Sequence, residues 1–110
     1  MKKYCLALDL KDDPILIAEY EAYHKKIWLE IEKSILDSGI IKMEIFRTGT
    51  RMMMLMETED SFSFDKKAAT DKNNPKVEEW EALMWKYQQA LPHAKSEEKW
   101  MLMERIFLLS

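Results

Sequence analysis

The chain has 110 residues, 47% of them hydrophobic and 34% charged, and contains only two glycines, three prolines and one cysteine. This composition is typical of one ordered globular domain, residues 1–110, and excludes a collagen, a linker and a disordered tail. The net charge of −3 comes from acidic and basic side chains mixed along the chain, so we expect no nucleic-acid partner.

Signals for membrane insertion and secretion are not found in the sequence pattern. Apolar runs such as residues 52–56 are far shorter than the ~18 residues of a membrane span. Charged residues interrupt the N-terminal segment where a signal peptide needs an apolar stretch. We therefore expect a cytoplasmic protein with no membrane partner. The single cysteine, Cys5, cannot form an intramolecular disulfide or, by itself, a zinc site.

Residues 3–10 are expected to form the first strand, because apolar side chains alternate there with a period of two. Asp13 followed by Pro14 predicts the start of a helix, since Asp caps free amides and proline needs no donor at the first position. One long helix is expected from there to Ser38-Gly39. Its apolar stripe follows steps of three and four: Ile17, Tyr20, His24, Ile27, Trp28, Ile31 and Ile35.

Two strands, residues 40–47 and 51–57, are expected next, joined by a hairpin turn at Thr48-Gly49-Thr50. The second strand is apolar on both faces, with methionines at 52, 54 and 56 on one face and Met53 and Leu55 on the other. Such a strand is typical of a sheet covered on both sides, so something must cover each face.

The C-terminal half predicts two more helices and a strand. Asp60 or Ser61 is expected to cap a short helix around residues 62–64. Asn73-Asn74-Pro75 predicts the start of a longer helix that runs to Leu91-Pro92. The apolar stripe of that helix comprises Val77, Trp80, Met84, Tyr87 and Leu91.

Residues 100–109 are apolar except for Glu104 and Arg105 and are expected to form the last strand. The order βαββαβ predicts an α+β, ferredoxin-like sandwich with helices on one face of an antiparallel sheet. Two long helices cover one face only, so a second copy of the sheet is the simplest cover for the other. We therefore predict a homodimer closed into a dimeric α/β barrel.

His24 is the ionisable side chain that this fold places on a buried apolar face, one helical turn after Tyr20 and one before Trp28. An imidazole ordinarily titrates near pH ~6.5, so a histidine between a phenol and an indole is suited to proton transfer. A satisfied core histidine is the alternative interpretation.

The other candidate residues have structural alternatives too. Tyr20 is suited to bind a ligand hydroxyl, and Trp28 and Trp80 to stack on a ring, yet each also fits a core. The methionine-rich strand is interpreted as flexible packing, because no Cys or His accompanies it, so we expect no metal site. The candidates for a second proton-transfer group are four strand carboxylates, each of which also fits an ion-pair role: Asp9, Glu44, Glu57 and Glu104.

Several segments taken together are characteristic. They are Tyr4-Cys5-Leu6-Ala7-Leu8-Asp9-Leu10, Tyr20-x-x-x-His24-x-x-x-Trp28-x-Glu30-Ile31, Gly39, Glu44-Ile45-Phe46, the Trp80 helix and Met103-Glu104-Arg105-Ile106-Phe107. Over nearly the whole chain this pattern resembles the L-rhamnose mutarotase family, most specifically in the Tyr-x-x-x-His-x-x-x-Trp helix.

The resemblance implies a small cytosolic homodimer that interconverts the α and β anomers of a deoxy-sugar without a cofactor. It also implies that His24 donates a proton and that Tyr20 and Trp80 contact the sugar. Trp28 is expected to add packing on the ring face, and the general base is left unassigned.

The chain departs from the family pattern at three positions. Met43 stands where the rhamnose enzyme has a substrate-contacting tyrosine, Trp80-Glu81 replaces paired tryptophans, and Leu29 replaces a proline. Met43 and Glu81 thereby become expected substrate contacts that alter which ring hydroxyls are bound. L-rhamnose is the first choice of substrate, with L-fucose or another 6-deoxy sugar as alternatives.

Two other classes of function stay open on the sequence. One is a non-catalytic dimer that binds a small ligand, in which His24 is merely part of the core. The other is a cofactor-free monooxygenase of the dimeric α/β barrel type, which shares the architecture but not the Tyr-x-x-x-His-x-x-x-Trp helix.

Overall fold

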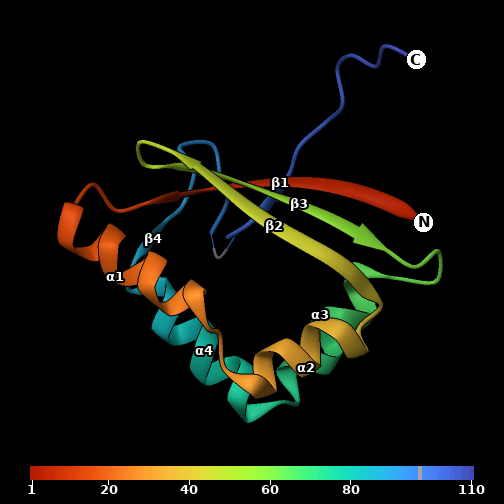
Figure 1. Ribbon diagram of the computed structural model, residues 1–110, viewed down its shortest axis with the longest axis horizontal. Coiled ribbons are helices and arrows are strands. Elements are labelled where there is room, and N and C mark those ends of the chain that lie inside the picture. Colours follow the sequence, from red (N-terminus) through yellow and green to blue (C-terminus); the bar gives the residue numbers. More distant parts are fainter. Residues whose placement is uncertain (97) are drawn as a thin grey trace.

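The computed structural model describes residues 1–96 and 98–110. Its elements follow the order β1 (Lys2–Leu10), α1 (Pro14–Lys25), α2 (Leu29–Asp37), β2 (Ile40–Thr48), β3 (Arg51–Thr58), α3 (Phe64–Lys72), α4 (Pro75–Trp85), β4 (Gln88–Gln89) and β5 (Met101–Leu102). All four helices lie on one face of the sheet, as Figure 1 shows. The predicted α+β class and one-sided helix layer are therefore confirmed.

The sheet is antiparallel, with β1 and β3 at its centre. The strand order is β2-β3-β1-β4, and the short β5 also pairs with β1. Leu6 lies opposite Met54, and Met43 lies opposite Met56. Between Ile40 and Lys42 the register of β2 shifts by one residue, which leaves Ile41 as an exposed bulge.

The helix starts predicted from the sequence are present. The Asp13 carboxylate accepts hydrogen bonds from the amides of Ile15 and Leu16 at 2.9 and 3.2 Å. Asn74 does the same for Lys76 and Val77 at 3.1 and 3.4 Å. The cap of α3 was misplaced, because Ser63 accepts from the Lys66 amide while Asp60 pairs with the N-terminal amine.

The single long helix expected over residues 14–38 is wrong. The backbone is extended at Lys26 (φ −153°, ψ 95°) and at Trp28 (φ −60°, ψ 141°), which separates α1 from α2. The break turns Ile27 and Trp28 inward, where both pack against the core. Leu29 begins α2 at the position where a proline would be tolerated, so the sequence lacks the proline that would have marked the break.

The two predictions at the C-terminal end need correction as well. The helix expected to reach Leu91 ends at Trp85, and Gln88–Gln89 instead pairs with β1. The strand expected over residues 100–109 is limited to Met101–Leu102, beyond which the chain is exposed and irregular. Apolar composition without a partner strand did not suffice to extend the sheet.

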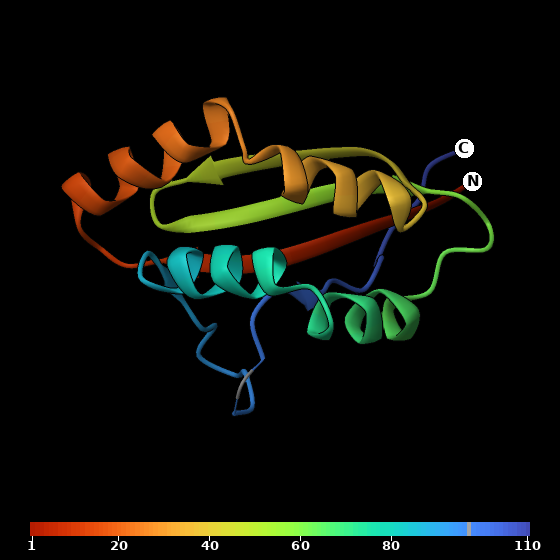
Figure 2. The same cartoon turned by 90° about the horizontal axis from the view of Figure 1, so that it is seen from below.

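Buried side chains form two separate clusters under the sheet. The first core is centred on β1, α1 and α4: Leu8, Leu10, Tyr20, Ile31, Met52, Val77, Trp80, Met84 and Tyr87. The second core lies toward α2 and α3: Leu6, Ile40, Met54, Met56 and Phe62. Figure 2 shows α1 and α2 in one row and α4 and α3 in a second row beneath the same sheet.

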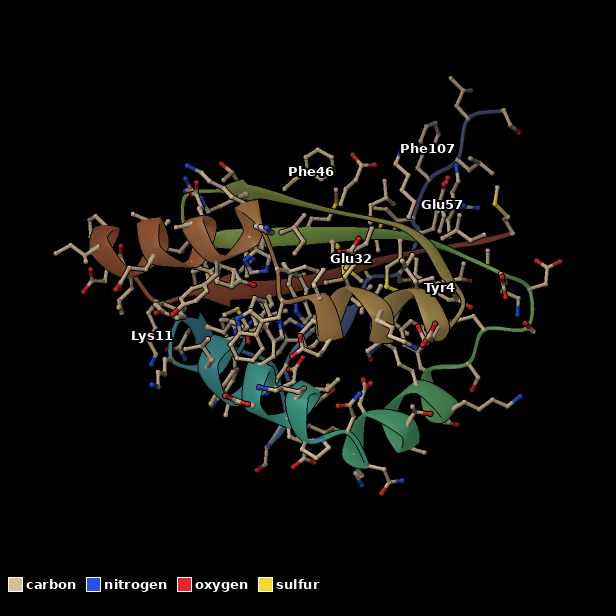
Figure 3. The ribbon with its side chains drawn as sticks, turned by 60° about the horizontal axis from the view of Figure 1, so that its bottom comes forward. Tyr4, Lys11, Glu32, Phe46, Glu57 and Phe107 are labelled. Carbon is tan, nitrogen blue, oxygen red and sulfur yellow. The ribbon has the colours of Figure 1, made fainter. Side chains whose placement is uncertain are left out.

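The face of the sheet opposite the helices carries no helix within the described residues. Phe46 is 49% exposed there, and the C-terminal Phe107 is 76% exposed. Both side chains lie on the side away from the helix layer (Figure 3). In the described part of the chain, every helix is too short or too polar to cross a bilayer.

Candidate active site

A cavity of about 310 Å³ lies between the helix layer and the sheet and touches both cores. The polar side chains in its wall are Tyr20, His24, Ser34, Lys67, Glu81 and Gln88. The apolar side chains in its wall include Leu6, Ile27, Ile35, Ile40, Met43, Ile45, Met54, Met56, Phe64 and Trp80. Residues from all four helices and from β1 to β4 thus converge on one space large enough for a small ligand.

His24 lies in the last turn of α1 and is half-buried against the cavity. Its Nδ1 atom is 2.8 Å from the Tyr20 carbonyl oxygen, which can only accept, so Nδ1 carries a hydrogen and donates it. This contact holds the ring in place and leaves Nε2 as the nitrogen that can exchange a proton with a ligand. The histidine therefore adjoins a void, as a catalytic role requires.

Aromatic rings surround the imidazole. The Tyr20 ring centroid is 4.3 Å from that of His24, and the Trp80 centroid is 5.8 Å away. Trp80 is 6% exposed and lines the cavity. The imidazole thus has one side packed and its orientation restricted, which suits a group that must meet a substrate in one geometry.

Tyr20 is 4% exposed and accepts a hydrogen bond from Gln88 Nε2 at 3.1 Å. Burial raises the pKa of Tyr20 to about 12; the hydrogen bond from Gln88 lowers it less, and the charge of Glu81 adds to the rise. The phenol is therefore neutral at physiological pH and keeps its own hydrogen to donate. Tyr20 is suited to anchor a hydroxyl, and it cannot act as a general base near pH 7.

Among the described residues, Glu81 supplies the carboxylate in the wall of the cavity. Its Oε2 atom lies 3.4 Å from Lys99 Nζ. The strand carboxylates considered from the sequence lie elsewhere. Asp9 pairs with Arg51 at 2.7 Å, Glu44 with Lys42 at 3.3 Å, Glu57 with Lys3 at 3.6 Å, and Glu104 is on the exposed C-terminal segment. The structure therefore moves the candidate base from the strands to α4.

Met43 and Trp28 are both predicted to contact the ligand, and the structure places them differently relative to the cavity. Met43 projects from β2 into the cavity beside Ile45, as the predicted ligand contact requires. Trp28 does not line the cavity; its ring packs behind Trp80 with centroids 5.0 Å apart, and Lys76 Nζ lies 5.7 Å from the ring. Trp28 thus supports the wall and lies outside the contact surface.

Gln88 is a site residue that sequence reasoning missed. The apolar stripe predicts a helix at this position, whereas Gln88 lies on β4, 4% exposed, in the wall of the cavity. The local sequence offers only two adjacent glutamines, residues 88 and 89, after the aromatic stripe. These glutamines indicate a site residue only once β4 is known to pair with β1.

The polar groups of the cavity are suited to proton transfer. An imidazole with one exchangeable nitrogen, a neutral phenol and a carboxylate line the same cavity, from α1 and α4. A general acid and a general base on one small ligand are what hemiacetal chemistry requires. Within the described residues, no three His, Cys, Asp or Glu side chains are grouped so that they could hold a metal ion.

Sequence comparison gives consistent findings. A family model described as "rhaM: L-rhamnose mutarotase" matches residues 3–109. The chain is 45% identical over 112 residues to the L-fucose mutarotase of Xanthomonas campestris pv. campestris, covering 100% of this chain and 90% of that protein. It is also 38% identical over 111 residues to a UPF0734 protein of Dictyostelium discoideum, covering 96% and 88%.

Two solved structures share the fold. The crystal structure of L-rhamnose mutarotase FA22100 from Formosa agariphila has a TM-score of 0.73 at 16% identity, with 100% of both chains covered. The tetracenomycin F2 cyclase of Streptomyces glaucescens, a type-II polyketide cyclase, has a TM-score of 0.67 at 18% identity, with 100% and 98% covered. At these identities the likeness concerns architecture, because one fold hosts several chemistries.

Proposed function

The chain belongs to the L-rhamnose mutarotase family, and from that premise we propose that it interconverts the α and β anomers of a 6-deoxy sugar with His24 as proton donor. Membership makes it an isomerase that acts on sugar anomers. We treat residues 1–110 as one mutarotase domain. The observation that carries the proposal is His24, held by the Tyr20 carbonyl at 2.8 Å on the wall of the cavity.

The proposed mechanism uses two proton transfers. His24 begins as an imidazolium, with Nδ1–H held by the Tyr20 carbonyl, and gives its Nε2 proton to the ring oxygen. At the same time the Glu81 carboxylate takes the proton of the anomeric hydroxyl, which leaves a neutral imidazole and a neutral carboxylic acid. The bond between C1 and the ring oxygen breaks, and an open-chain aldehyde with a free C5 hydroxyl results. After rotation about C1–C2, the C5 hydroxyl attacks the other face of the carbonyl and both protons return. Neither oxidation nor group transfer takes place.

The remaining residues position the sugar in this proposal. The Tyr20 hydroxyl anchors a ring hydroxyl, and Trp80 packs on the apolar face of the ring. Met43 contacts the sugar from β2, and Glu81 contacts it as the base. Trp28 acts through Trp80, because its ring lies behind that indole.

The apolar part of the cavity favours a deoxy sugar. Leu6, Ile40, Met54 and Met56, all of them buried, line the wall that belongs to the second core. A C6 methyl group gains about 0.8 kcal/mol on burial there, whereas a C6 hydroxyl would lose its water against four side chains that offer it no strong hydrogen-bond partner.

L-fucose becomes the first substrate to test. The sequence by itself favoured L-rhamnose, but the protein that is 45% identical is named an L-fucose mutarotase. We therefore propose L-fucose as the preferred sugar and keep L-rhamnose as the second. The two sugars carry the same C6 methyl group, so the apolar wall does not separate them.

A homodimer completes the proposal. The open face of the sheet carries Phe46, and the irregular C-terminal segment carries four exposed apolar side chains, at residues 106–109. A second copy packed on this face would bury both. Sedimentation at micromolar concentration should give a particle of about twice the chain mass of 13.2 kDa, and a 13.2 kDa particle contradicts the dimer.

The test of the activity is anomer exchange measured by NMR. Saturation of one anomeric proton of equilibrated L-fucose or L-rhamnose should transfer to the other anomer faster in the presence of the protein. His24→Ala should lower this rate by about 10² to 10⁴-fold with the fold intact. His93→Ala, which alters the exposed second histidine, serves as the matched control.

The other outcomes distinguish the remaining classes of function. Unchanged exchange for every 6-deoxy sugar contradicts the mutarotase and favours a non-catalytic binding dimer. Exchange that survives His24→Ala assigns the proton transfer to another group. The cytoplasmic location stays a prediction, which fractionation of the source cell tests.

A further inference from the structure

Within the described structure, the side-chain amide of Gln88 forms a hydrogen bond through its nitrogen but not through its oxygen. Its Nε2 atom donates to the Tyr20 hydroxyl at 3.1 Å, while its Oε1 atom is buried and has no hydrogen-bond partner within the described structure. Gln88 as a whole is 4% exposed. A buried acceptor without a partner is unfavourable, and native proteins leave few of them. Such a group is expected to have a partner that binds during function.

The position of Gln88 indicates what that partner is. Its side chain lines the same cavity as His24 and Glu81 and is hydrogen-bonded to the Tyr20 hydroxyl. Because Tyr20 accepts from Gln88, the phenol keeps its hydrogen for a ligand. A hydrogen-bond donor and a hydrogen-bond acceptor therefore stand side by side, and a hydroxyl group is the simplest ligand that can satisfy both.

We propose that Gln88 is a substrate-binding residue whose Oε1 atom accepts a hydrogen bond from a ring hydroxyl of the sugar, next to the contact made by Tyr20. This inference rests on the proposed mutarotase function. It makes Gln88 a determinant of specificity, because L-fucose and L-rhamnose differ in the configuration of the hydroxyls at C2 and C4. An acceptor in a fixed position binds only one of the two configurations well.

The first measurement uses Gln88→Met, which keeps the length of the side chain and removes the amide. Exchange NMR on L-fucose should show kcat/KM lowered about 10- to 100-fold. The same comparison is then made on 2-deoxy-, 3-deoxy- and 4-deoxy-L-fucose. For one of these analogues the effect of Gln88→Met should fall below about threefold, since the hydroxyl that Gln88 binds is already missing.

A second measurement separates binding from the positioning of Tyr20. Gln88→Met is introduced into Tyr20→Phe, where there is no phenol hydroxyl left to orient. A further loss of kcat/KM in this background supports direct contact between Gln88 and the sugar. No further loss assigns Gln88 to positioning and overturns the proposal.

Two controls distinguish a folding defect from a specific loss of kcat/KM. Gln89→Met, on the exposed neighbour in β4, should leave exchange unchanged. Thermal unfolding of Gln88→Met should stay near that of the wild type, because removal of a buried acceptor with no partner offsets loss of the hydrogen bond to Tyr20. If this variant does not fold, Gln88→Asn, which retracts the amide by one carbon, is used with the same expected loss.

The outcomes also separate this inference from the function on which it rests. A wild-type protein that accelerates no 6-deoxy sugar overturns both. A wild-type protein that is active, with Gln88→Met equally active or impaired to the same degree on every analogue, overturns the role of Gln88 alone.

Discussion

The two halves of the cavity differ in how their polar groups are used. In the half next to the first core, Gln88 Oε1 is buried without a partner in the described structure, and the Tyr20 hydroxyl keeps a hydrogen to donate. In the half next to the second core, Lys67 and Ser34 both contact Asp71, at 2.6 and 3.3 Å. The proposed chemistry therefore uses the first half, where a buried acceptor is left without a partner.

The halves also differ in the elements that form them. The polar half is built at the ends of α1 and α4 and on β4, where a change of backbone direction brings side chains from distant segments together. The apolar half is built mainly from the alternating positions of β1, β2 and β3, which present flexible methionines and branched side chains. The first half is therefore suited to proton transfer and the second to selecting the shape of the ligand.

The largest expected effect within the polar half, after His24 itself, comes from Glu81→Gln. Loss of the proposed base should lower kcat for anomer exchange about 10²-fold, with a smaller change in KM. Glu79→Gln, two residues earlier on α4 and paired with Lys76 at 3.4 Å, is the matched control. Equal activity of both variants would place the base outside this half of the cavity.

A substitution in the first core that lies outside the cavity should lower stability without lowering kcat. Leu8 is fully buried and does not line the cavity, so Leu8→Ala should lower the free energy of unfolding by about 2 to 5 kcal/mol. Below its melting temperature the variant should keep a wild-type kcat. Urea unfolding and exchange NMR on the same sample check the two statements, and a large loss of kcat in folded protein contradicts the separation.

Tyr20 predicts how stability depends on alkaline pH. Burial raises its pKa from 10.0 to about 12, so between these values the unfolded chain loses a proton that the folded chain keeps. Stability present below pH 10 is therefore lost as the pH rises toward 12, by about 2 to 3 kcal/mol for this group. In urea unfolding, Tyr20→Phe should lose less stability than the wild type over this range. Parallel curves for the two proteins contradict the buried, neutral phenol.

The smallest expected effect concerns the apolar half. The wild type should prefer L-fucose to L-galactose, which carries a C6 hydroxyl, by about 10- to 100-fold in kcat/KM. Met54→Gln places an amide in that half and should reduce the preference to about threefold. Met53→Gln, on the opposite face of β3, is the control. A preference unchanged by Met54→Gln would show that the C6 group binds elsewhere.

Local signals were sufficient for the regular elements and for part of the site. The alternation in residues 3–10, the caps at Asp13 and Asn74, and the hairpin at Gly49 depend on near neighbours in the chain, and the structure contains each of them. The spacing of Tyr20 and His24 placed both side chains on one face of α1, and they meet there. One-turn spacing needs no information from the rest of the fold.

Long-range pairing decided what the sequence by itself could not. The amphipathic stripe from Ile17 to Ile35 is continuous, yet the helix breaks at residues 26–28 so that both segments can follow the sheet. Trp28 therefore leaves the stripe and packs behind Trp80. Periodicity measures which residues are buried, and it does not distinguish one helix from two in line.

Sequence alone thus determined the fold class, the start of the helix that carries His24 and the resemblance to the family. The first two depend on residue types at short, fixed spacings. Only the tertiary structure moved the candidate base from the strands to Glu81 and brought Gln88 against Tyr20. Gln88 and Tyr20 are 68 residues apart in the chain, and they meet only because β4 pairs with β1. Contacts at such separations depend on how the elements pack, which no local pattern records.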